Sequence, residues 1–182
     1  VKPDEFYGMV FQDSDVAKWI EAAAYALAAG EDPELEKAVD ETIQLYGASQ
    51  HEDGYVDSYF TVKCPDKMWT NICDAHELYC AGHMMEAAVA YYEVTGKREL
   101  LDIMSKSADC IYEQFMKKNT RAYPGHPEVE LALMRLWRAT GNEKYKELAK
   151  HFVDVRGQAP NYFVEEKKNR GWNVWDGAEE LN

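Results

Sequence analysis

Residues 77–94 read ELYCAGHMMEAAVAYYEV, and this stretch decides the fold class. Apolar or small residues occupy nearly every position, so a helix formed here is apolar on most of its sides. A helix of that kind is stable where other elements cover it all round. We therefore expect a buried helix over 77–94, with further helices packed against it.

Two other segments have the same character, namely 16–29 (VAKWIEAAAYALAA) and 127–139 (PEVELALMRLWRA). Three more segments place apolar residues on one helical face only, at i, i+3, i+4 and i+7. These amphipathic segments are 33–46, 97–116 and 142–156. The two kinds alternate along the chain, which predicts an inner row of buried helices wrapped by an outer row.

The junctions between these segments repeat as well. Thr95-Gly96-Lys97 and Thr140-Gly141-Asn142 are 45 residues apart and each follows an inner helix. Gly30 stands at the matching place in the first pair. Glycine suits the left-handed position at a helix C-terminus, and repeats of this period are typical of stacked helical hairpins. We predict an all-α fold with three helical hairpins over residues 1–157.

Residues 158–182 form an aromatic tail whose structure the sequence does not predict. Its aromatic residues have no partner that the pattern identifies, and they are Tyr162, Phe163, Trp172 and Trp175.

The bulk composition excludes several classes of protein. The 182 residues are 46% hydrophobic, which suits one domain with a core, and the net charge is −13. Such a charge argues against a nucleic-acid partner and against an anionic membrane surface. No apolar run reaches about 18 residues, so no membrane-spanning helix is expected. Residues 1–11 do not read as a signal peptide.

The cysteines bear on the compartment. Cys64, Cys73, Cys80 and Cys110 form no C-x-x-C pair, and we expect reduced thiols in a cytoplasmic protein. A secreted origin stays open, because the chain begins at Val1 and a targeting signal that precedes it would not be seen.

The long loops, 47–76 and 117–126, each lead from an outer helix to the next inner one. In a ring of parallel hairpins such loops lie on one face, together with the N-termini of the inner helices. Aromatic faces and fixed polar groups on such a face suit a sugar site. The candidate substrate-binding residues there are Asp53, Tyr55, His76, Glu77, Tyr123 and His126.

Simpler interpretations exist for some of these residues. Asp53-Gly54 is a common turn dipeptide, and the two histidines are also consistent with structural roles. His76, Cys80 and His83 share one helix face, a spacing that would permit zinc. They lack the H-E-x-x-H signature, so we expect Cys80 and His83 to be packed residues and predict no metal site in this chain.

Four blocks of this sequence resemble glycoside hydrolase family 127, the family of β-L-arabinofuranosidases. They are DSDVAKWIEA at 13–22, DGYVDSYFT at 53–61, HELYCAGH at 76–83 and YPGHPEVEL at 123–131. The resemblance covers residues 10–157 and implies an (α/α)6 barrel, of which three hairpins are about half. It also implies that His76 and His126 hydrogen-bond a sugar substrate.

In that family the acid/base is a glutamate, and the nucleophile is a cysteine thiolate in a zinc site of one glutamate and three cysteines. The cysteines of this chain do not match that set, so we expect no catalytic residue and no zinc ligand before Asn182. The resemblance thus implies a fragment that supplies sugar-binding groups to a zinc-dependent hydrolase and is inactive alone. A half-ring exposes the apolar flanks of its inner helices, which predicts self-association or pairing with the missing half.

Two other hypotheses remain at this point. One is a different helical-toroid sugar enzyme, such as an unsaturated uronyl hydrolase or a sugar epimerase, which would use paired carboxylates. The other is a non-catalytic helical-repeat domain that binds a protein partner, which predicts no sugar binding.

Overall fold

The computed structural model describes residues 8–174, and these residues contain helices and loops but no strand. A short 3-10 helix, η1 (Pro65–Lys67), and a π-helical turn, η2 (Glu113–Lys117), accompany the α-helices. The α-helices are α1 (Asp13–Ala29), α2 (Pro33–Ala48), α3 (Ser58–Lys63), α4 (Glu77–Thr95), α5 (Glu99–Tyr112), α6 (Val129–Thr140), α7 (Glu143–Val155) and α8 (Tyr162–Asn169).

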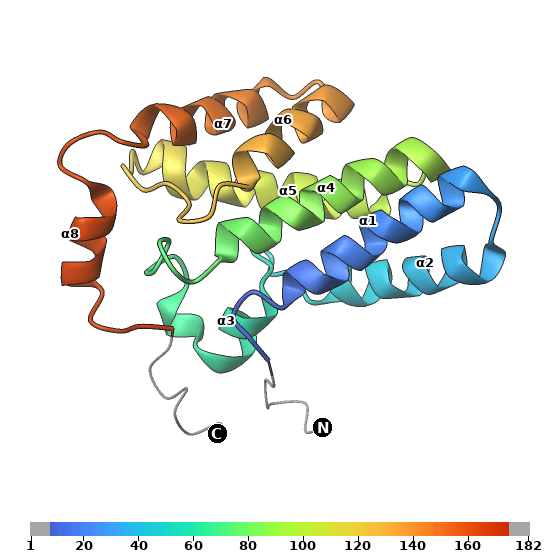
Figure 1. Cartoon of the computed structure of the whole chain (residues 1–182), viewed down its shortest axis with the longest axis horizontal. Coiled ribbons are helices and arrows are strands. Elements are labelled where there is room, and N and C mark those ends of the chain that lie inside the picture. Colours follow the sequence, from blue (N-terminus) through green and yellow to red (C-terminus); the bar gives the residue numbers. More distant parts are fainter. Residues whose placement is uncertain (1–7, 175–182) are drawn as a thin grey trace.

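Three hairpins stand side by side in Figure 1, each made of an inner and an outer helix. The inner helices α1, α4 and α6 contact one another in that order, with α4 in the middle. The outer helices α2, α5 and α7 each pack on the inner helix that precedes them. The prediction of an all-α partial toroid built from helical hairpins is therefore confirmed.

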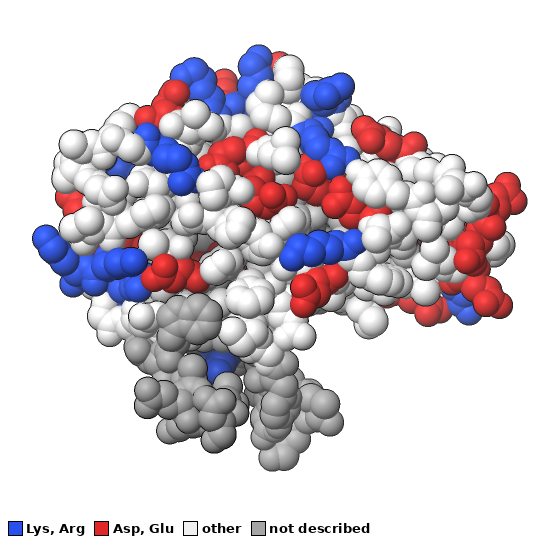
Figure 2. Space-filling view, in the orientation of Figure 1, with Lys and Arg blue, Asp and Glu red and all other residues white. Residues whose placement is uncertain are grey.

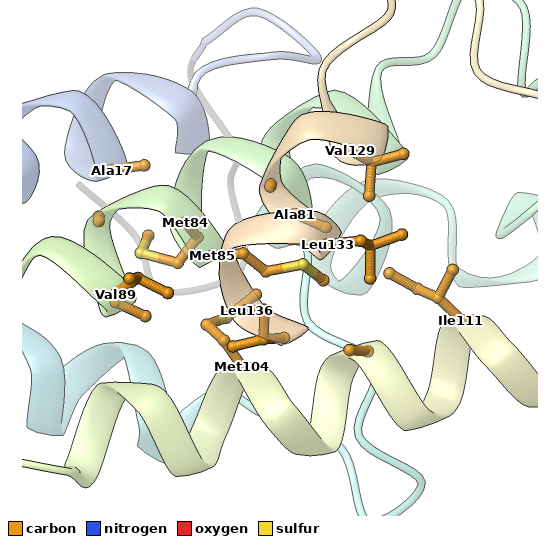
Figure 3. Close-up of a cluster of buried hydrophobic side chains, with 14 of the residues drawn as sticks. Ala17, Ala81, Met84, Met85, Val89, Met104, Ile111, Val129, Leu133 and Leu136 are labelled. Atoms are coloured by element: carbon orange, nitrogen blue, oxygen red, sulfur yellow. The ribbon is translucent and has the colours of Figure 1, made fainter. Parts of the chain in front are cut away.

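Helix α4 is covered on nearly every side, as its sequence predicts. Thirteen of its 19 residues are buried, because α1, α5 and α6 surround it. Figure 3 shows Met84, Met85 and Val89 of α4 directed toward side chains of the neighbouring helices. Met104 of α5 and Leu136 of α6 meet them there, and both are fully buried. This cluster forms the centre of the main core.

The expectation of burial on most sides was wrong for α6, in which four of 12 residues are buried, and likewise for α1. The buried residues of α1 are Ser14, Ala17, Ile20, Ala23 and Ala24, which occupy one face. Val16, Trp19 and Tyr25 of the same helix are 38%, 41% and 54% exposed. The reason is topological: α4 packs between two inner helices, whereas among the described residues α1 and α6 each pack mainly against α4 within the inner row.

The helix ends follow the sequence signals with one exception. Gly96 and Gly141 end α4 and α6 with φ of 73° and 74°, the left-handed geometry that glycine favours. Asp32 caps α2 by accepting a hydrogen bond from the backbone N–H of Leu35 at 3.0 Å. Gly30 ends α1 in extended backbone with φ of 177°, so the expected left-handed conformation is not used there.

The segment after α7 folds back onto the hairpins. Helix α8 starts at Tyr162, and the ring of Phe163 lies 4.4 Å from that of Tyr123 between centroids. Trp172 packs edge-on against Phe60 of α3, with centroids 6.2 Å apart. These aromatic residues, to which the sequence assigned no partner, thus cover the loops before α4 and α6; Trp175 lies outside the described residues.

Charged side chains are distributed unevenly over the surface. Figure 2 shows Asp and Glu gathered around the end of the molecule where α1 turns into α2. Lys97 partly offsets this charge by pairing with Glu36 and Asp40 at 2.6 and 2.5 Å. Within residues 8–174, no helix combines the length and apolarity required to cross a membrane.

Candidate functional site

His76 stands at the N-terminus of α4 in a left-handed conformation, with φ of 62°. Its ring atom Nδ1 lies 2.7 Å from the backbone carbonyl oxygen of Asp74. Because a carbonyl only accepts, Nδ1 carries the hydrogen of the neutral ring, and Nε2 is left as an acceptor. Burial lowers the pKa of His76, which favours that neutral form.

His126 reaches the same place from the loop before α6. The ring centroids of His76 and His126 are 6.0 Å apart, and the His126 side chain is exposed. The loop comes this close because Gly125 packs against backbone: a β-carbon at Gly125 would lie 1.7 Å from the carbonyl oxygen of Cys73. The structure therefore brings the two histidines together, as their equivalent positions in consecutive repeats predict.

Tyr79 packs against both histidine rings, and we call the surface formed by His76, Tyr79 and His126 the histidine face. The Tyr79 ring is 4.5 Å from the ring of His126 and 5.5 Å from that of His76 between centroids. Its hydroxyl accepts a hydrogen bond from Lys18 of α1 at 3.1 Å. The ring of Phe11 also packs against that of His76, with centroids 5.4 Å apart. An aromatic platform beside polar nitrogens is a suitable surface for a sugar ring.

A second polar pair lies one turn further along α4. His83 stacks edge-on against Tyr79 at 4.4 Å, and its Nδ1 is 3.4 Å from a carboxylate oxygen of Glu128. Burial lowers the pKa of His83 and raises that of Glu128, to which the nearby Glu86 also contributes. Both shifts favour the uncharged forms, which weakens the electrostatic attraction between His83 and Glu128.

The histidine face contains a small depression between the loops before α4 and α6. Two segments line it, and the residues are Ile72, Cys73, His76, Leu78, Tyr79, Pro124, Gly125 and His126.

Tyr55 and Glu77 lie beneath this face, where both are buried. The Tyr55 hydroxyl donates to Oε1 of Glu77 at 2.7 Å, and the backbone N–H of Trp69 donates to the same carboxylate at 3.1 Å. Burial raises the pKa of Glu77 well above its usual value, with Asp57 adding to the effect. These contacts hold the 55–77 segment together, and a direct role of the two residues in sugar binding stays a prediction.

Asp53 and Tyr123 lie away from the histidine pair. Asp53 is exposed and accepts a hydrogen bond from the N–H of Tyr55 at 3.0 Å, in the turn that Asp53-Gly54 suggests. Tyr123 is buried between Phe163 and the guanidinium of Arg156, which lies 4.8 Å from the Tyr123 ring. The structure thus does not place either side chain beside His76.

The zinc implied by the resemblance does not fit the residues described. Within positions 8–174, no three His, Cys, Asp or Glu side chains are grouped as a metal site would require. Cys80 is buried with 4% of its surface exposed, as expected of a core residue. Nδ1 of His76 is already bonded to the Asp74 carbonyl. No chemical step is therefore assigned to a metal here.

Comparison with known proteins identifies the chain. The family described as "Beta-L-arabinofuranosidase, GH127 catalytic domain" matches residues 2–180. The chain belongs to glycoside hydrolase family 127. The family resemblance seen in the sequence blocks is confirmed.

Three relatives illustrate the relationship. A non-reducing end β-L-arabinofuranosidase of Bifidobacterium longum subsp. longum is 44% identical over 173 residues, which are 91% of this chain and 26% of that protein. A crystal structure of a GH127 β-L-arabinofuranosidase from Geobacillus stearothermophilus T6 is 56% identical with a TM-score of 0.90, covering 93% of this chain and 27% of that one. A GH127 β-arabinofuranosidase structure is 38% identical with a TM-score of 0.79, covering 84% and 26%.

This GH127 chain therefore spans about a quarter of the length of the relatives it matches. It corresponds to part of relatives that are themselves named β-L-arabinofuranosidases. Sequence reasoning found its two histidines but gave no role to Glu166 and Arg170, which contact the loop before His76. No local signal marks them, because they are more than 90 positions away from that loop.

Proposed function

We propose that this chain supplies part of the sugar-binding surface of a hydrolase that acts on terminal β-L-arabinofuranosides. The observation that carries the proposal is the pair of histidine rings 6.0 Å apart on one face, with the ring of Tyr79 in contact with both, at 4.5 and 5.5 Å. The relatives are named for that activity, and they retain 44% and 56% identity with this chain.

The chemistry of the two histidines suits a neutral sugar. Nε2 of His76 accepts a hydrogen bond from a hydroxyl group, because its Nδ1 hydrogen is held by the Asp74 carbonyl. The exposed ring of His126 offers a second polar contact, and the faces of Tyr79 and Phe11 provide apolar cover. An uncharged His76 is useful here, because it binds a hydroxyl without recruiting anions.

The nucleophile, the acid/base and the zinc are proposed to come from outside this chain, in keeping with the family resemblance. On this proposal the chain binds and orients the sugar, and its own residues neither form nor break a bond.

We further propose that α1 packs against the part of the barrel that the longer relatives carry and this chain does not. Val16 and Trp19 lie three positions apart on α1 and are 38% and 41% exposed, so they leave apolar surface on this helix. Self-association through the same surface is the competing outcome, and sedimentation of this chain with Trp19→Lys distinguishes the two. A monomeric wild-type chain argues for the barrel partner, whereas a dimer that Trp19→Lys dissociates argues for self-association.

The experiment for the main proposal is release of L-arabinose from a terminal β-L-arabinofuranoside by the full-length protein that carries this chain. His76→Ala and His126→Ala are each expected to reduce kcat/KM by about tenfold or more, the cost of one lost hydrogen bond in a desolvated site. His151→Gln is the matched control, since His151 lies on α7 and bonds the Thr120 carbonyl at 3.1 Å. Unchanged kinetics in both alanine variants would reject the proposal, and turnover of a different sugar would favour another toroid hydrolase or an epimerase.

A further inference from the structure

Helix α8 contacts the loop that leads into α4, although about 90 residues separate them in sequence. In Figure 1 α8 lies beyond the last hairpin, next to the loops that precede α4 and α6. The contact is polar and largely buried, with Glu166 only 7% exposed. It involves the backbone of the segment that ends at His76.

Glu166 binds two consecutive backbone amides of this loop. The N–H of Ile72 donates to Oε1 at 2.5 Å, and the N–H of Cys73 donates to Oε2 at 2.9 Å. The Tyr162 hydroxyl also donates to Oε1, at 3.2 Å. A carboxylate that receives two N–H groups fixes the direction of both peptides, and each such charge-assisted bond is stronger than a neutral one.

Arg170 binds the next part of the same loop. Its side chain is 6% exposed, and its guanidinium donates to Oδ1 of Asn71 and, at 2.7 Å, to Oδ2 of Asp74. The backbone N–H of Asp74 also donates to Oδ1 of Asn71, at 3.0 Å. Although burial alone would raise it, the pKa of Asp74 is lowered, mainly by the hydrogen bond from Arg170.

These contacts lead directly to both histidines. Arg170 contacts the side chain of Asp74, and the backbone carbonyl of the same residue accepts the hydrogen bond from Nδ1 of His76. The carbonyl of Ile72, whose N–H is bound by Glu166, accepts from the N–H of Gly125 at 3.2 Å. Gly125 precedes His126, so one residue, Ile72, connects Glu166 to the loop of the second histidine.

We infer that Glu166 and Arg170 are positioning residues for His76 and His126, acting through the backbone of residues 71–74. The inference rests on the proposed sugar-binding role of the two histidines. Displacement of a binding group by about 1 Å lowers activity far more than the lost contact would suggest. If Glu166 and Arg170 only added stability, their substitution would lower the melting temperature and leave the histidines in place.

Glu166→Gln in the full-length protein is the main test, with Glu165→Gln as the control. Glutamine keeps the size of the side chain but has one acceptor oxygen, so its amide group faces one of the two N–H donors. Glu165 is the adjacent residue on α8 and makes only a long ion pair with Arg121, at 3.9 Å. Arg170→Lys is a milder second variant, because lysine keeps the charge and loses the two-pronged contact with Asn71 and Asp74.

Two readouts are measured for each variant. The first is the nuclear magnetic resonance signal of the His76 ring in protein with labelled histidine, which requires no substrate. The second is the split between KM and kcat for arabinofuranoside hydrolysis, repeated in the His76→Ala background.

We expect Glu166→Gln to shift the His76 signal and to raise KM by roughly tenfold, and Arg170→Lys to do the same more weakly. In the His76→Ala background the effect of Glu166→Gln on KM should become smaller, because only the route through His126 remains and residues acting as a unit are non-additive. A lower melting temperature with the His76 signal and KM unchanged in both variants would overturn the inference. If His76→Ala and His126→Ala both leave hydrolysis unchanged, the proposed function fails, and the ring signal alone still decides whether Glu166 positions His76.

Discussion

Gly125 approaches the backbone of Cys73 so closely that a β-carbon on Gly125 would lie 1.7 Å from the Cys73 carbonyl oxygen. The two loops of the histidine face therefore meet through main-chain atoms, without an intervening side chain. The N–H of Gly125 adds a hydrogen bond to the carbonyl of Ile72 at 3.2 Å. The position of His126 beside His76 depends on glycine at position 125.

The first prediction follows from this contact. Gly125→Ala must push the two loops apart, and we expect the free energy of unfolding to fall by about 1–3 kcal/mol, as in other overpacked sites. Gly30→Ala is the control, since Gly30 has extended backbone and a β-carbon added there would meet no neighbouring group within 4 Å. Chemical denaturation of both variants measures the difference, and equal values would show that the close approach is absent.

Tyr55 provides a second prediction. Tyr55→Phe removes the donor to Glu77 at 2.7 Å in a buried site, and we expect a loss of about 1–3 kcal/mol in unfolding free energy. Tyr25→Phe removes a comparable bond, to Glu21 at 3.0 Å, from a residue that is 54% exposed. That control should change stability by less than about 0.5 kcal/mol. Similar losses in the two variants would contradict the buried network.

Arg135 supports a third prediction, because it lies on α6 and links that helix to α1 and α4. Its guanidinium lies 3.3 Å from Glu21 of α1 and 2.5 Å from Glu86 of α4. Arg135→Met leaves Glu86, only 10% exposed, without its cation, and we expect a destabilisation of roughly 1–3 kcal/mol after allowing for partial exposure of Arg135. Adding Glu86→Gln should restore part of that loss. A double-mutant cycle by denaturation tests this, and simple additivity would argue against the coupling.

A fourth prediction concerns pH. Burial, together with the nearby Asp13, raises the pKa of Asp57 to about 8 from an unfolded value of 3.8. Between these two pH values the Asp57 carboxyl group is protonated in the folded state and ionised in the unfolded state. The contribution of Asp57 to the free energy of unfolding is therefore complete below about pH 4 and is lost as the pH rises toward about 8.

Asp57→Asn removes the titration but keeps the acceptor that binds the N–H of Phe60 at 3.0 Å. Melting temperatures across that pH range should therefore fall more steeply for the wild type than for the variant. Parallel profiles would show that Asp57 does not titrate in this range.

The sequence predicted the three hairpins because hydrophobic periodicity reports directly which helical face is buried. It overestimated the burial of α1 and α6, since an apolar composition does not reveal how many neighbours a helix has. Trp19 and Leu78 look alike in the pattern, yet Trp19 is 41% exposed and Leu78 is 2% exposed.

Part of the candidate site was predicted as well, because the repeat of the hairpins indicates where some of its residues lie. His76 and His126 precede equivalent helices in consecutive repeats, so their proximity follows from the repeat itself. Tyr55 and Glu77 lie in or next to a long loop, where no periodicity indicates which side chains turn inward. Glu166 could not be found at all, because its pairing with Ile72 depends on how the chain after α7 folds back.

The backbone amides of Ile72 and Cys73 point to a side chain of α8, not to a group in any hairpin. Detachment of this single eight-residue helix would expose them to solvent while the three hairpins stay folded. Hydrogen–deuterium exchange at these two amides therefore reports the opening of α8 separately from global unfolding. Neighbouring amides within α4 should exchange far more slowly. The difference between the two exchange rates therefore measures how often α8 releases the loop before His76.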